Sequence, residues 1–468
     1  MPHLPRLAPL FLLATAALPA AEARDPATLA NTLCAGCHGP TLTGGTGPNI
    51  LTEKLKHGTD DASLLRAIRD GFPQTGMAGL GAVLSTEEQT AMVAYLKQQA
   101  RAYALGRIPL PAIPAPAVIK SERHTFRLET FTPGLDTPWG IVFLPDGSLL
   151  VSDRIGQLRA IAKDGTLNPE PIRNTPKPFV RQDGGYLDLI AHPGYAQNGW
   201  LYLAYVELGE DRTKSMTVIV RGRVKAGAWV DEQLIFRAPQ KFYYTDTSHY
   251  GCRFLWDPTG NLFFTIGERG TATDSQDLTN PLGKIHRIKD DGTTPPDNPF
   301  MKQAGAWPTI WSYGHRHPQG LEYHPVTGKL WATEHGPRNG DELNRIEPGR
   351  NYGWPRASWG QVQFRETIGG VFAPGTEQPI VHWSPGIAPS AIAFVTSPRF
   401  PNWKNNLLVG GLVGRQLRRV VTQGNLVVLE EILFTDQGRV RDVTIGPDGL
   451  IYLAMNAPGR IARLVPVE

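Results

Sequence analysis

Cysteine, long apolar runs and excess charge are all scarce in this sequence. Three cysteines among 468 residues exclude a disulfide framework. No segment beyond the N-terminus reaches the roughly 18 consecutive apolar residues that a membrane-spanning helix needs. Lys and Arg number 47 against 43 Asp and Glu, and the resulting net charge of +4 is spread along the chain without a basic run. We therefore expect neither stable membrane insertion nor nucleic-acid binding.

Turn-forming residues are plentiful, and the apolar fraction is large enough for a core. Apolar residues make up 41% of the chain and charged residues 19%, which is typical of a folded protein. Gly (50) and Pro (41) are together about a fifth of the sequence. This balance disfavours a helical bundle and favours many short strands. The length of 468 residues gives room for two or three domains.

The first residues have the pattern of an export signal. Arg6 supplies a positive charge, residues 7–18 are apolar, and residues 21–23 (Ala-Glu-Ala) form a small-x-small cleavage site. About a dozen apolar residues are too few to span a bilayer, so the alternative of a permanent anchor is weaker. We predict a signal peptide over residues 1–23, cleaved near Ala23, and an exported, periplasmic protein.

Composition divides the remaining chain into three parts. Residues 24–105 are helical in character, and Ser85 with Glu88 three residues later has the pattern of a capping box at a helix start. Residues 106–122 are rich in proline, which predicts a semi-rigid polyproline linker. Residues 123–468 change to short β-rich runs separated by Gly, Pro, Asp and Asn.

A turn followed by a short apolar strand recurs six times in this last part. The turns carry pairs such as Asn-Gly and Asp-Gly, which tolerate positive φ and suit hairpins. The copies lie at 145–152, 197–204, 258–265, 326–333, 403–410 and 447–454. One copy per roughly 58 residues fits blades of four strands, whereas a β-sandwich has too few strands to use this length. We predict a mainly β protein, a six-bladed β-propeller preceded by a small helical domain.

Cys34, Cys37 and His38 form a C-x-x-C-H motif, the spacing of covalent c-type haem attachment. Two thiols at this spacing reach the two vinyl groups of one porphyrin, and the adjacent His becomes the proximal iron ligand. A zinc site would need a second pair of ligands nearby, and a redox dithiol would not need His38. We therefore predict haem c, attached through Cys34 and Cys37, with His38 as an iron ligand.

Residues 24–105 also resemble the small class I cytochromes c over their whole length. Residues 44–51 (Gly-Gly-Thr-Gly-Pro-Asn-Ile-Leu) resemble the Gly/Pro loop of that family. The family supplies a distal Met from a loop before its last helix, and Met77 stands at that place. Met92, inside an apolar helical pattern, and His57, in a turn-like Lys-His-Gly sequence, are the rival ligands. The resemblance implies an all-α cytochrome c domain whose Met/His-ligated haem carries electrons and binds no substrate.

An electron-carrying haem fused to a propeller implies an electron source. Haem accepts one electron at a time, so oxidation of a stable alcohol needs a two-electron cofactor. No G-x-G-x-x-G sequence opens a βαβ unit, which disfavours NAD or FAD in a Rossmann fold. Five ordered segments are present instead: 311–320 (WSYGHRHPQG), 334–342 (EHGPRNGDE), 351–355 (NYGWP), 389–390 (PS) and 439–442 (RVRD). Together they resemble the soluble aldose/glucose dehydrogenases that depend on pyrroloquinoline quinone (PQQ), a family of six-bladed propellers, over about residues 124–465.

The resemblance implies catalytic and cofactor-binding roles. His249 matches the general base, and Arg316 matches the arginine over the reactive quinone carbonyl. His335 falls where the family has a cofactor-contacting side chain. Arg439 and Arg441 match the pair that binds the PQQ carboxylates, for which arginine is a bidentate and always charged partner.

The resemblance also implies two calcium sites. The main-chain carbonyls of Gly336 and Pro337 match the pair that binds the calcium ion of the cofactor, which acts as a Lewis acid. Glu342 and Tyr352 match a second, structural calcium site of the aldose dehydrogenase branch.

The chain departs from this family at two places. Where the family often has a lysine that contacts the cofactor, this chain has Val413, and we expect Arg415 to supply the missing charge. A family glutamine near the substrate aligns with either Gln182 or Asp183. These departures leave PQQ binding as the prediction and the identity of the sugar open.

These observations predict an exported quinohaemoprotein. It would oxidise aldoses to lactones by hydride transfer to PQQ and pass electrons through haem c to an external acceptor, a cytochrome or a membrane quinone chain. The alternative is a non-redox propeller, a lactone hydrolase or a carbohydrate-binding module with a separate electron-transfer haem. A hydrolase would not need Arg439 and Arg441, and a pure binding module would not need His249.

Overall fold

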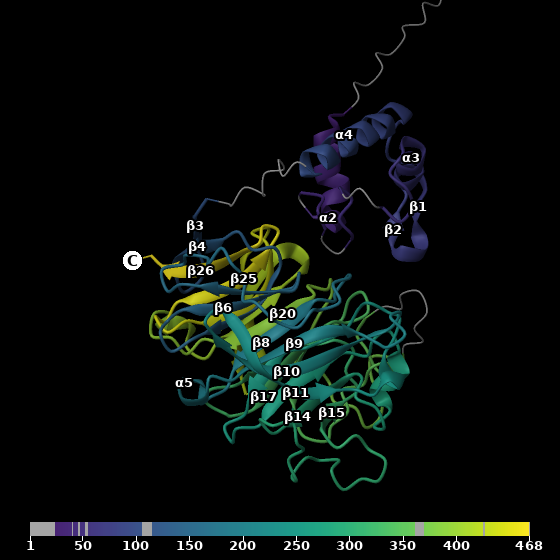
Figure 1. Cartoon of the computed structure of the whole chain (residues 1–468). Helices are drawn as coiled ribbons and strands as arrows, with labels where there is room; N and C mark the ends of the chain where they lie inside the picture. The colour runs from purple at the N-terminus through teal and green to yellow at the C-terminus, as the bar shows by residue number, and fades with distance from the viewer. Residues whose placement is uncertain are drawn as a thin grey trace, which may run out of the picture. The chain divides into compact units, whose positions relative to one another are not determined.

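The computed structural model describes residues 24–39, 41–44, 47–51, 55–104, 115–360, 369–424 and 426–467. The predicted signal peptide, residue 105 and the first part of the predicted linker, residues 106–114, lie outside the described residues. The chain divides into two compact units, the first of which ends at residue 108 (Figure 1).

The first unit consists of helices around one apolar core. The helical segments are α1 (Pro26–Leu29), the π-helical turn η1 (Ala30–Cys34), α2 (Ala35–His38), α3 (Asp61–Asp70), the 3₁₀ turn η2 (Pro73–Thr75) and α4 (Thr86–Ala104). Ile68 from α3 and Met92 from α4 pack with Leu29 and Leu51 in this core. Met92 is completely buried there, which confirms its predicted place in the core.

A short hairpin accompanies the helices of the first unit. Strands β1 (Gly71–Phe72) and β2 (Met77–Ala78) pair in antiparallel fashion between α3 and α4. Helix α3 ends because Gly71 takes a φ of 65°, a conformation that glycine adopts without a steric penalty.

The predicted capping box at the start of α4 is confirmed. The Glu88 main-chain N–H donates to Ser85 Oγ at 3.2 Å, and the Ser85 N–H donates to Glu88 Oε2 at 3.0 Å. Arg24 also forms an ion pair with Glu88, with 2.7 Å between Nε and Oε1. These contacts satisfy main-chain donors at the helix start and tie the beginning of the described chain to α4.

The second unit is a six-bladed β-propeller, and its described strands form six sheets arranged in a ring. From the innermost strand outward, the sheets are β5 (Pro138–Phe143), β6 (Leu149–Asp153), β7 (Gln157–Ile161); β8 (Tyr186–Ala191), β9 (Leu201–Leu208), β10 (Ser215–Lys225), β11 (Ala228–Arg237); β12 (Phe254–Trp256), β13 (Leu262–Ile266), β14 (Lys284–Ile288), β15 (Ile310–Tyr313); β16 (Pro318–Tyr323), β17 (Leu330–Glu334), β18 (Asp341–Ile346), β19 (Val381–Trp383); β20 (Pro389–Phe394), β21 (Leu407–Gly411), β22 (Gln416–Gln423), β23 (Leu426–Phe434); and β24 (Arg439–Ile445), β25 (Ile451–Asn456), β26 (Arg460–Pro466), β4 (Thr125–Pro133), β3 (Ala117–Lys120). The connecting segments include α5 (Tyr195–Asn198) and the 3₁₀ turns η3 (Gln240–Phe242), η4 (Ala272–Gln276), η5 (Pro401–Trp403) and η6 (Val413–Arg415).

The ring closes because strands from the two ends of the propeller share one sheet. Strand β4, from the start of the unit, pairs with β26, from its end, in antiparallel register. The innermost strand of each sheet contacts the innermost strand of the next, including β24 against β5. Closure of this kind leaves only short sheet edges exposed.

The six repeated turn-and-strand segments are confirmed as one structural element per blade. Each copy is the turn that leads into the second strand of its sheet, namely β6, β9, β13, β17, β21 and β25. These strands lie within their sheets and are buried almost throughout, which explains their continuous apolar sequences.

The first strand of the propeller lies within the C-terminal part of the predicted linker. The linker was expected to reach residue 122, but Ala117–Lys120 forms β3 and pairs with β4. Ile119 packs against the core while Val118 is 59% exposed, the alternation of an edge strand. The prolines just before this segment favoured the prediction of a linker over that of a short strand.

A buried charge network joins three innermost strands at the centre of the ring. Arg253, just before β12, contacts Asp188 on β8 and Asp442 on β24, each at 3.1 Å. Its guanidinium also lies 4.4 Å from the centre of the Trp139 ring on β5. Burial raises the pKa of Asp188 to about 7. Because removing one partner would leave a buried charge unpaired, this network fixes the strands that carry the site.

Candidate functional site

The predicted site residues of the propeller lie at one end of the ring of inner strands. The segments that enter the inner strands carry Gln182, Asp183, His249 and Arg316, and the start of inner strand β24 carries Arg439 and Arg441. Each second strand runs antiparallel to its inner strand, so the loops after the second strands return to the same end. Those loops carry His335, Gly336, Pro337 and Arg415. The fold therefore brings residues from five blades to one face.

The predicted base, His249, is paired with a buried carboxylate. His249 Nδ1 donates a hydrogen bond to Glu268 Oε1. The His249 side chain is 16% exposed, whereas that of Glu268 is fully buried on the loop after β13. The Glu268 main-chain N–H donates to the Arg316 carbonyl at 2.9 Å, which ties this loop to the next blade. Glu268 was not predicted from the sequence.

Two further histidine rings lie beside His249. The His317 ring centre is 5.0 Å from that of His249 and 4.9 Å from that of His335. Burial lowers the pKa of His317, and it lowers the pKa of His335 to about 4, so both rings are neutral at pH 7. His335 Nε2 donates to the Pro389 carbonyl at 2.9 Å.

The structure adds His317 to the predicted set. Gln319 Nε2 donates to His317 Nε2 at 3.0 Å, which leaves the proton of the neutral ring on Nδ1. His317 Nδ1 is buried and has no hydrogen-bond partner among the described residues. A buried donor without a partner in the protein is available to a bound ligand.

Arginines also gather at the same end of the ring, where they influence one another electrostatically. Burial lowers the pKa of Arg439, and the charges of Arg415 and Arg154 lower it further. Burial and the charges of Arg439 and Arg154 lower the pKa of Arg441 to about 9. Asp183 opposes both shifts. Four guanidiniums repel one another and are opposed only by Asp183 and, at Arg441, by Asp153, so the cluster fits a polycarboxylate such as PQQ.

The two candidates for the position of the family glutamine, Gln182 and Asp183, have different surroundings. Gln182 has a φ of 49°, and its side-chain Oε1 accepts a hydrogen bond from Thr247 Oγ1 at 2.6 Å. Asp183 instead acts electrostatically on the arginine cluster. Arg154 Nη1 donates to the Gln182 carbonyl at 2.6 Å and holds this turn. Val413, at the position of the family lysine, is 52% exposed.

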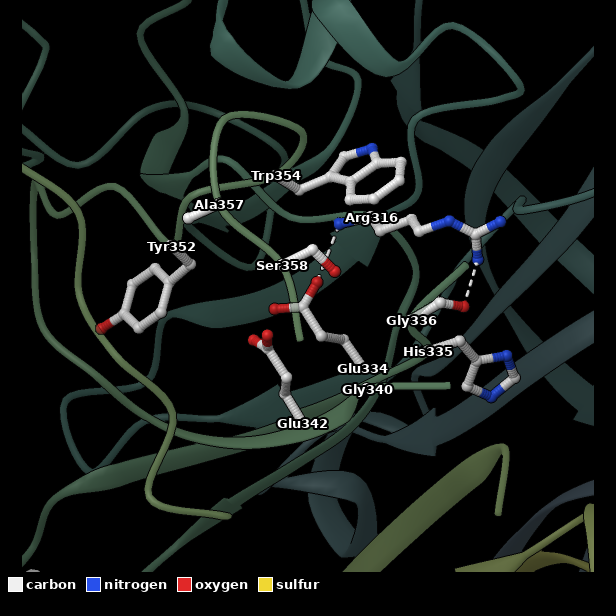
Figure 2. Close-up of a pocket in the computed structure, with 10 residues that line it drawn as sticks. All are labelled: Arg316, Glu334, His335, Gly336, Gly340, Glu342, Tyr352, Trp354, Ala357 and Ser358. Atoms are coloured by element: carbon white, nitrogen blue, oxygen red, sulfur yellow. Dashed lines mark hydrogen bonds between the residues drawn. The ribbon is translucent and has the colours of Figure 1, made fainter. Parts of the chain in front are cut away.

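Arg316 also lines a small cavity together with Glu334 and Glu342 (Figure 2). Its main-chain N–H donates to Glu334 Oε2 at 2.7 Å, and its Nη1 donates to the Gly336 carbonyl at 2.8 Å. The Gly336 carbonyl, predicted to bind calcium, therefore shares its oxygen with a guanidinium. A carbonyl oxygen has two lone pairs, so one remains for a cation.

Glu334 and Glu342 converge on that cavity, and Tyr352 turns its hydroxyl away (Figure 2). The cavity is about 10 Å³, room for one water molecule or ion. Burial and the Glu334 carboxylate raise the pKa of Glu342 well above its usual range. The Tyr352 hydroxyl donates to the Arg345 carbonyl at 2.7 Å, so only the main-chain carbonyl of Tyr352 remains for a cation. Two facing carboxylates fit a divalent ion.

Among the described residues, no group of three or more His, Cys, Asp and Glu side chains has the arrangement of a metal site.

The first unit places three of the predicted haem residues on one continuous helical stretch and the fourth, Met77, on a strand. Cys34 ends η1, and Cys37 and His38 lie in α2, with Cys34 half-buried and His38 buried. One helical stretch thus carries both thiols and the adjacent imidazole, which fits covalent attachment of a haem. Met77 lies on β2 and is partly buried. His57 lies in an exposed turn, as expected, and stacks on Phe72 at 3.9 Å.

No described helix combines the length and apolarity needed to cross a bilayer.

Comparisons with known proteins identify both units. Residues 135–463 match the family described as glucose / sorbosone dehydrogenase, and residues 21–96 match cytochrome c oxidase, cbb3-type, subunit III. The aldose sugar dehydrogenase YliI of Escherichia coli (strain K12) is 36% identical over 366 residues, covering 76% of this chain and 97% of that protein.

Two solved structures support the same assignment. The apo-form of the soluble aldose sugar dehydrogenase of E. coli matches with a TM-score of 0.70 at 36% identity, over 73% of this chain and 100% of that chain. The PQQ-bound aldose sugar dehydrogenase of Streptomyces coelicolor matches with a TM-score of 0.57 at 27% identity, over 77% of this chain and 100% of that chain. The chain belongs to the glucose/sorbosone dehydrogenase family and carries an N-terminal cytochrome c domain.

Proposed function

We propose that the protein is a PQQ-dependent aldose dehydrogenase that delivers electrons to a covalently bound haem c and then to an external acceptor. The observation that carries this proposal is the pairing of His249 with buried Glu268 at the end of the propeller that also holds the arginine cluster. A positioned base and a polycarboxylate-binding cluster are the two features that alcohol oxidation on PQQ needs. The family membership of the propeller supports the same reaction.

His249 takes the proton of the substrate hydroxyl. Its Nδ1 is engaged by Glu268, so Nε2 is the nitrogen that faces the substrate. Glu268 holds the ring in one orientation and stabilises the imidazolium that forms. PQQ, when bound, accepts the two electrons that leave the anomeric carbon. The aldose loses two electrons and two protons and leaves as a lactone.

The other site residues hold the cofactor and its ions. Arg439 and Arg441, with Arg415 beside them, bind carboxylates, while Arg316 and His335 contact the ring system. The carbonyls of Gly336 and Pro337 bind the calcium ion of the cofactor, and Glu342 with the main-chain carbonyl of Tyr352 binds a second calcium ion.

The first unit carries the electrons onward. Cys34 and Cys37 attach haem c, and His38 and Met77 ligate the iron, which closes it to substrates. Export to the periplasm with cleavage near Ala23 agrees with covalent haem loading and with an acceptor that is a cytochrome or a membrane quinone chain.

Replacement of the base tests the proposal. His249→Asn keeps a donor for Glu268 but cannot take a proton, so aldose-dependent dye reduction by PQQ-loaded protein should fall about 10²–10⁴-fold. The exposed His382, which stacks on Trp359 at 4.1 Å, provides the matched control His382→Asn. Unchanged turnover in His249→Asn would contradict the role of the base. Failure of the native protein to bind PQQ would favour a non-redox propeller.

A further inference from the structure

Arg269 lies beside the pair formed by His249 and Glu268 and contacts the loop that carries His249. Arg269 follows Glu268 directly and is completely buried. Its Nη1 donates to the Ser248 carbonyl, and its Nη2 donates to the Asp246 carbonyl at 2.6 Å. One guanidinium thus holds two carbonyls immediately before the base.

The same guanidinium also fixes the residue after the base. It lies 3.6 Å from the centre of the Tyr250 ring, a cation–π contact. The Tyr250 hydroxyl is 2.7 Å from Ser215 Oγ, and Thr217 Oγ1 donates to the Tyr250 carbonyl at 2.7 Å. The backbone on both sides of His249 is therefore anchored to the neighbouring blade and to Arg269.

These contacts hold two residues in an unusual backbone conformation. His249 has a φ of 53° and Arg269 a φ of 58°, left-handed conformations that residues other than glycine rarely adopt. Such conformations persist only where the surroundings hold them in place, and they concentrate at active sites. Gly267 allows the two loops to meet, because a Cβ there would lie 2.2 Å from the His249 carbonyl oxygen.

We propose that Arg269 is a positioning residue for the base. It joins the Glu268 loop and the His249 loop into one unit, so that His249 Nδ1 stays directed at Glu268 and Nε2 stays directed at the substrate. This role rests on the proposed function of His249 as base. Arg269 does not touch the substrate or cofactor in this scheme and acts only through the two loops.

The test compares Arg269→Lys with a matched control, Arg419→Lys. Arg419 is equally buried in another blade, where it donates to Asn406 Oδ1 at 2.7 Å and to Glu431 Oε2 at 2.9 Å, away from the base. A lysine cannot reach two carbonyls with a planar fork. We expect Arg269→Lys to lower kcat about 10²-fold or more with little change in KM or PQQ affinity. Arg419→Lys should keep the native kcat. Added guanidinium ion should restore part of the activity of Arg269→Ala.

A proton NMR readout separates this inference from the enzyme's turnover. The hydrogen-bonded His249 Nδ1 proton should give a low-field resonance in the native protein, absent in His249→Asn, which identifies it. We expect the resonance to be lost in Arg269→Lys and kept in Arg419→Lys. Its persistence in Arg269→Lys would overturn the positioning role whatever the turnover. Its loss in Arg269→Lys would support the role even if the native protein oxidised no aldose, a result that would count against the proposed function alone.

Discussion

At the scale of single residues, the site depends on buried groups whose partners come from distant parts of the chain. Glu268 is fully buried and meets His249, nineteen positions earlier, only because two loops of one blade fold together. The carboxylate fixes the tautomer of the ring, and the ring then has one nitrogen left for the substrate.

Replacing Glu268 by Gln should therefore lower kcat by about 10²–10⁴-fold while PQQ binding stays unchanged. The amide can present its NH₂ group to His249 Nδ1 and so favour the wrong tautomer. Steady-state kinetics of the PQQ-loaded variant measure the effect. A variant with native kcat would show that the carboxylate has no part in proton transfer.

We expect Arg441 to lower the stability of the cofactor-free protein and to strengthen PQQ binding. Burial and neighbouring arginines lower its pKa to about 9, so its charge is unfavourable in the cofactor-free protein. Arg441→Gln should raise the Tm of that form and weaken PQQ binding about 10- to 100-fold, the loss of a hydrogen bond to a charged group.

Calorimetry and PQQ titration measure both quantities for Arg441→Gln. Arg463→Gln, on β26, is the control because that side chain is part-exposed and lies against the Phe131 ring at 5.1 Å. A lower Tm with unchanged PQQ affinity would contradict the role of Arg441.

The sequence identified residues within ordered motifs and missed those without one. Arg439 and Arg441 alternate on one strand, and Arg316 stands in a long motif. Glu268 and Arg154 lie in loops whose sequence carries no chemical signature, whereas His317 stands in the same motif as Arg316 but was given no role. One signal could have located Glu268 and Arg154, because each follows a copy of the repeated strand by two or three residues, as His335 does.

At the scale of elements, β17 and β18 place two carboxylates on one cavity. Glu334 pairs with Glu342 across these strands. Burial and the neighbouring Glu334 carboxylate raise the pKa of Glu342, so a cation bound between the two carboxylates would relieve their repulsion. The native protein should therefore gain about 2.7 kcal/mol at a free calcium concentration of 100 Kd.

A thermal-shift series with chelator and added Ca²⁺ measures this gain. Glu342→Gln removes one of the two facing carboxylates, so in cofactor-free protein its calcium-dependent gain in Tm should be clearly smaller than that of the native protein. A variant that still responds to calcium as the native protein does would contradict the second site.

The start of α4 should weaken in acid. The hydrogen bonds from Arg24 and Ser85 lower the pKa of Glu88 to about 2, below its ordinary value of 4.5. The stabilisation is therefore complete above pH 4.5 and is lost as the pH falls towards 2. The difference in Tm of the first unit between the native protein and Glu88→Gln should shrink over this range. A difference independent of pH would contradict the role of the ionised carboxylate.

Elements were predictable where local sequence and tertiary contacts agree. The capping box and the second strand of each blade were found because turn chemistry and apolar runs are local signals. Strand β3 was missed because its pairing with β4 is tertiary, and the β1–β2 hairpin was missed because two-residue strands have no period to detect.

At the scale of the whole molecule, the propeller closes on itself and a cytochrome c domain is joined to it in one chain. Linking two modules converts an encounter between them into an intramolecular event with an effective concentration of about millimolar. The sequence predicted this organisation because the repeat and the C-x-x-C-H motif are each self-contained. The electron path from sugar to iron is the central claim.

Anaerobic stopped-flow absorbance of haem-loaded protein tests this claim most directly. We predict that the reduced haem band grows only when PQQ, Ca²⁺ and an aldose are all present, and that omission of any one abolishes it. Reduction of an added dye while the haem stays oxidised would contradict the electron path between the two units.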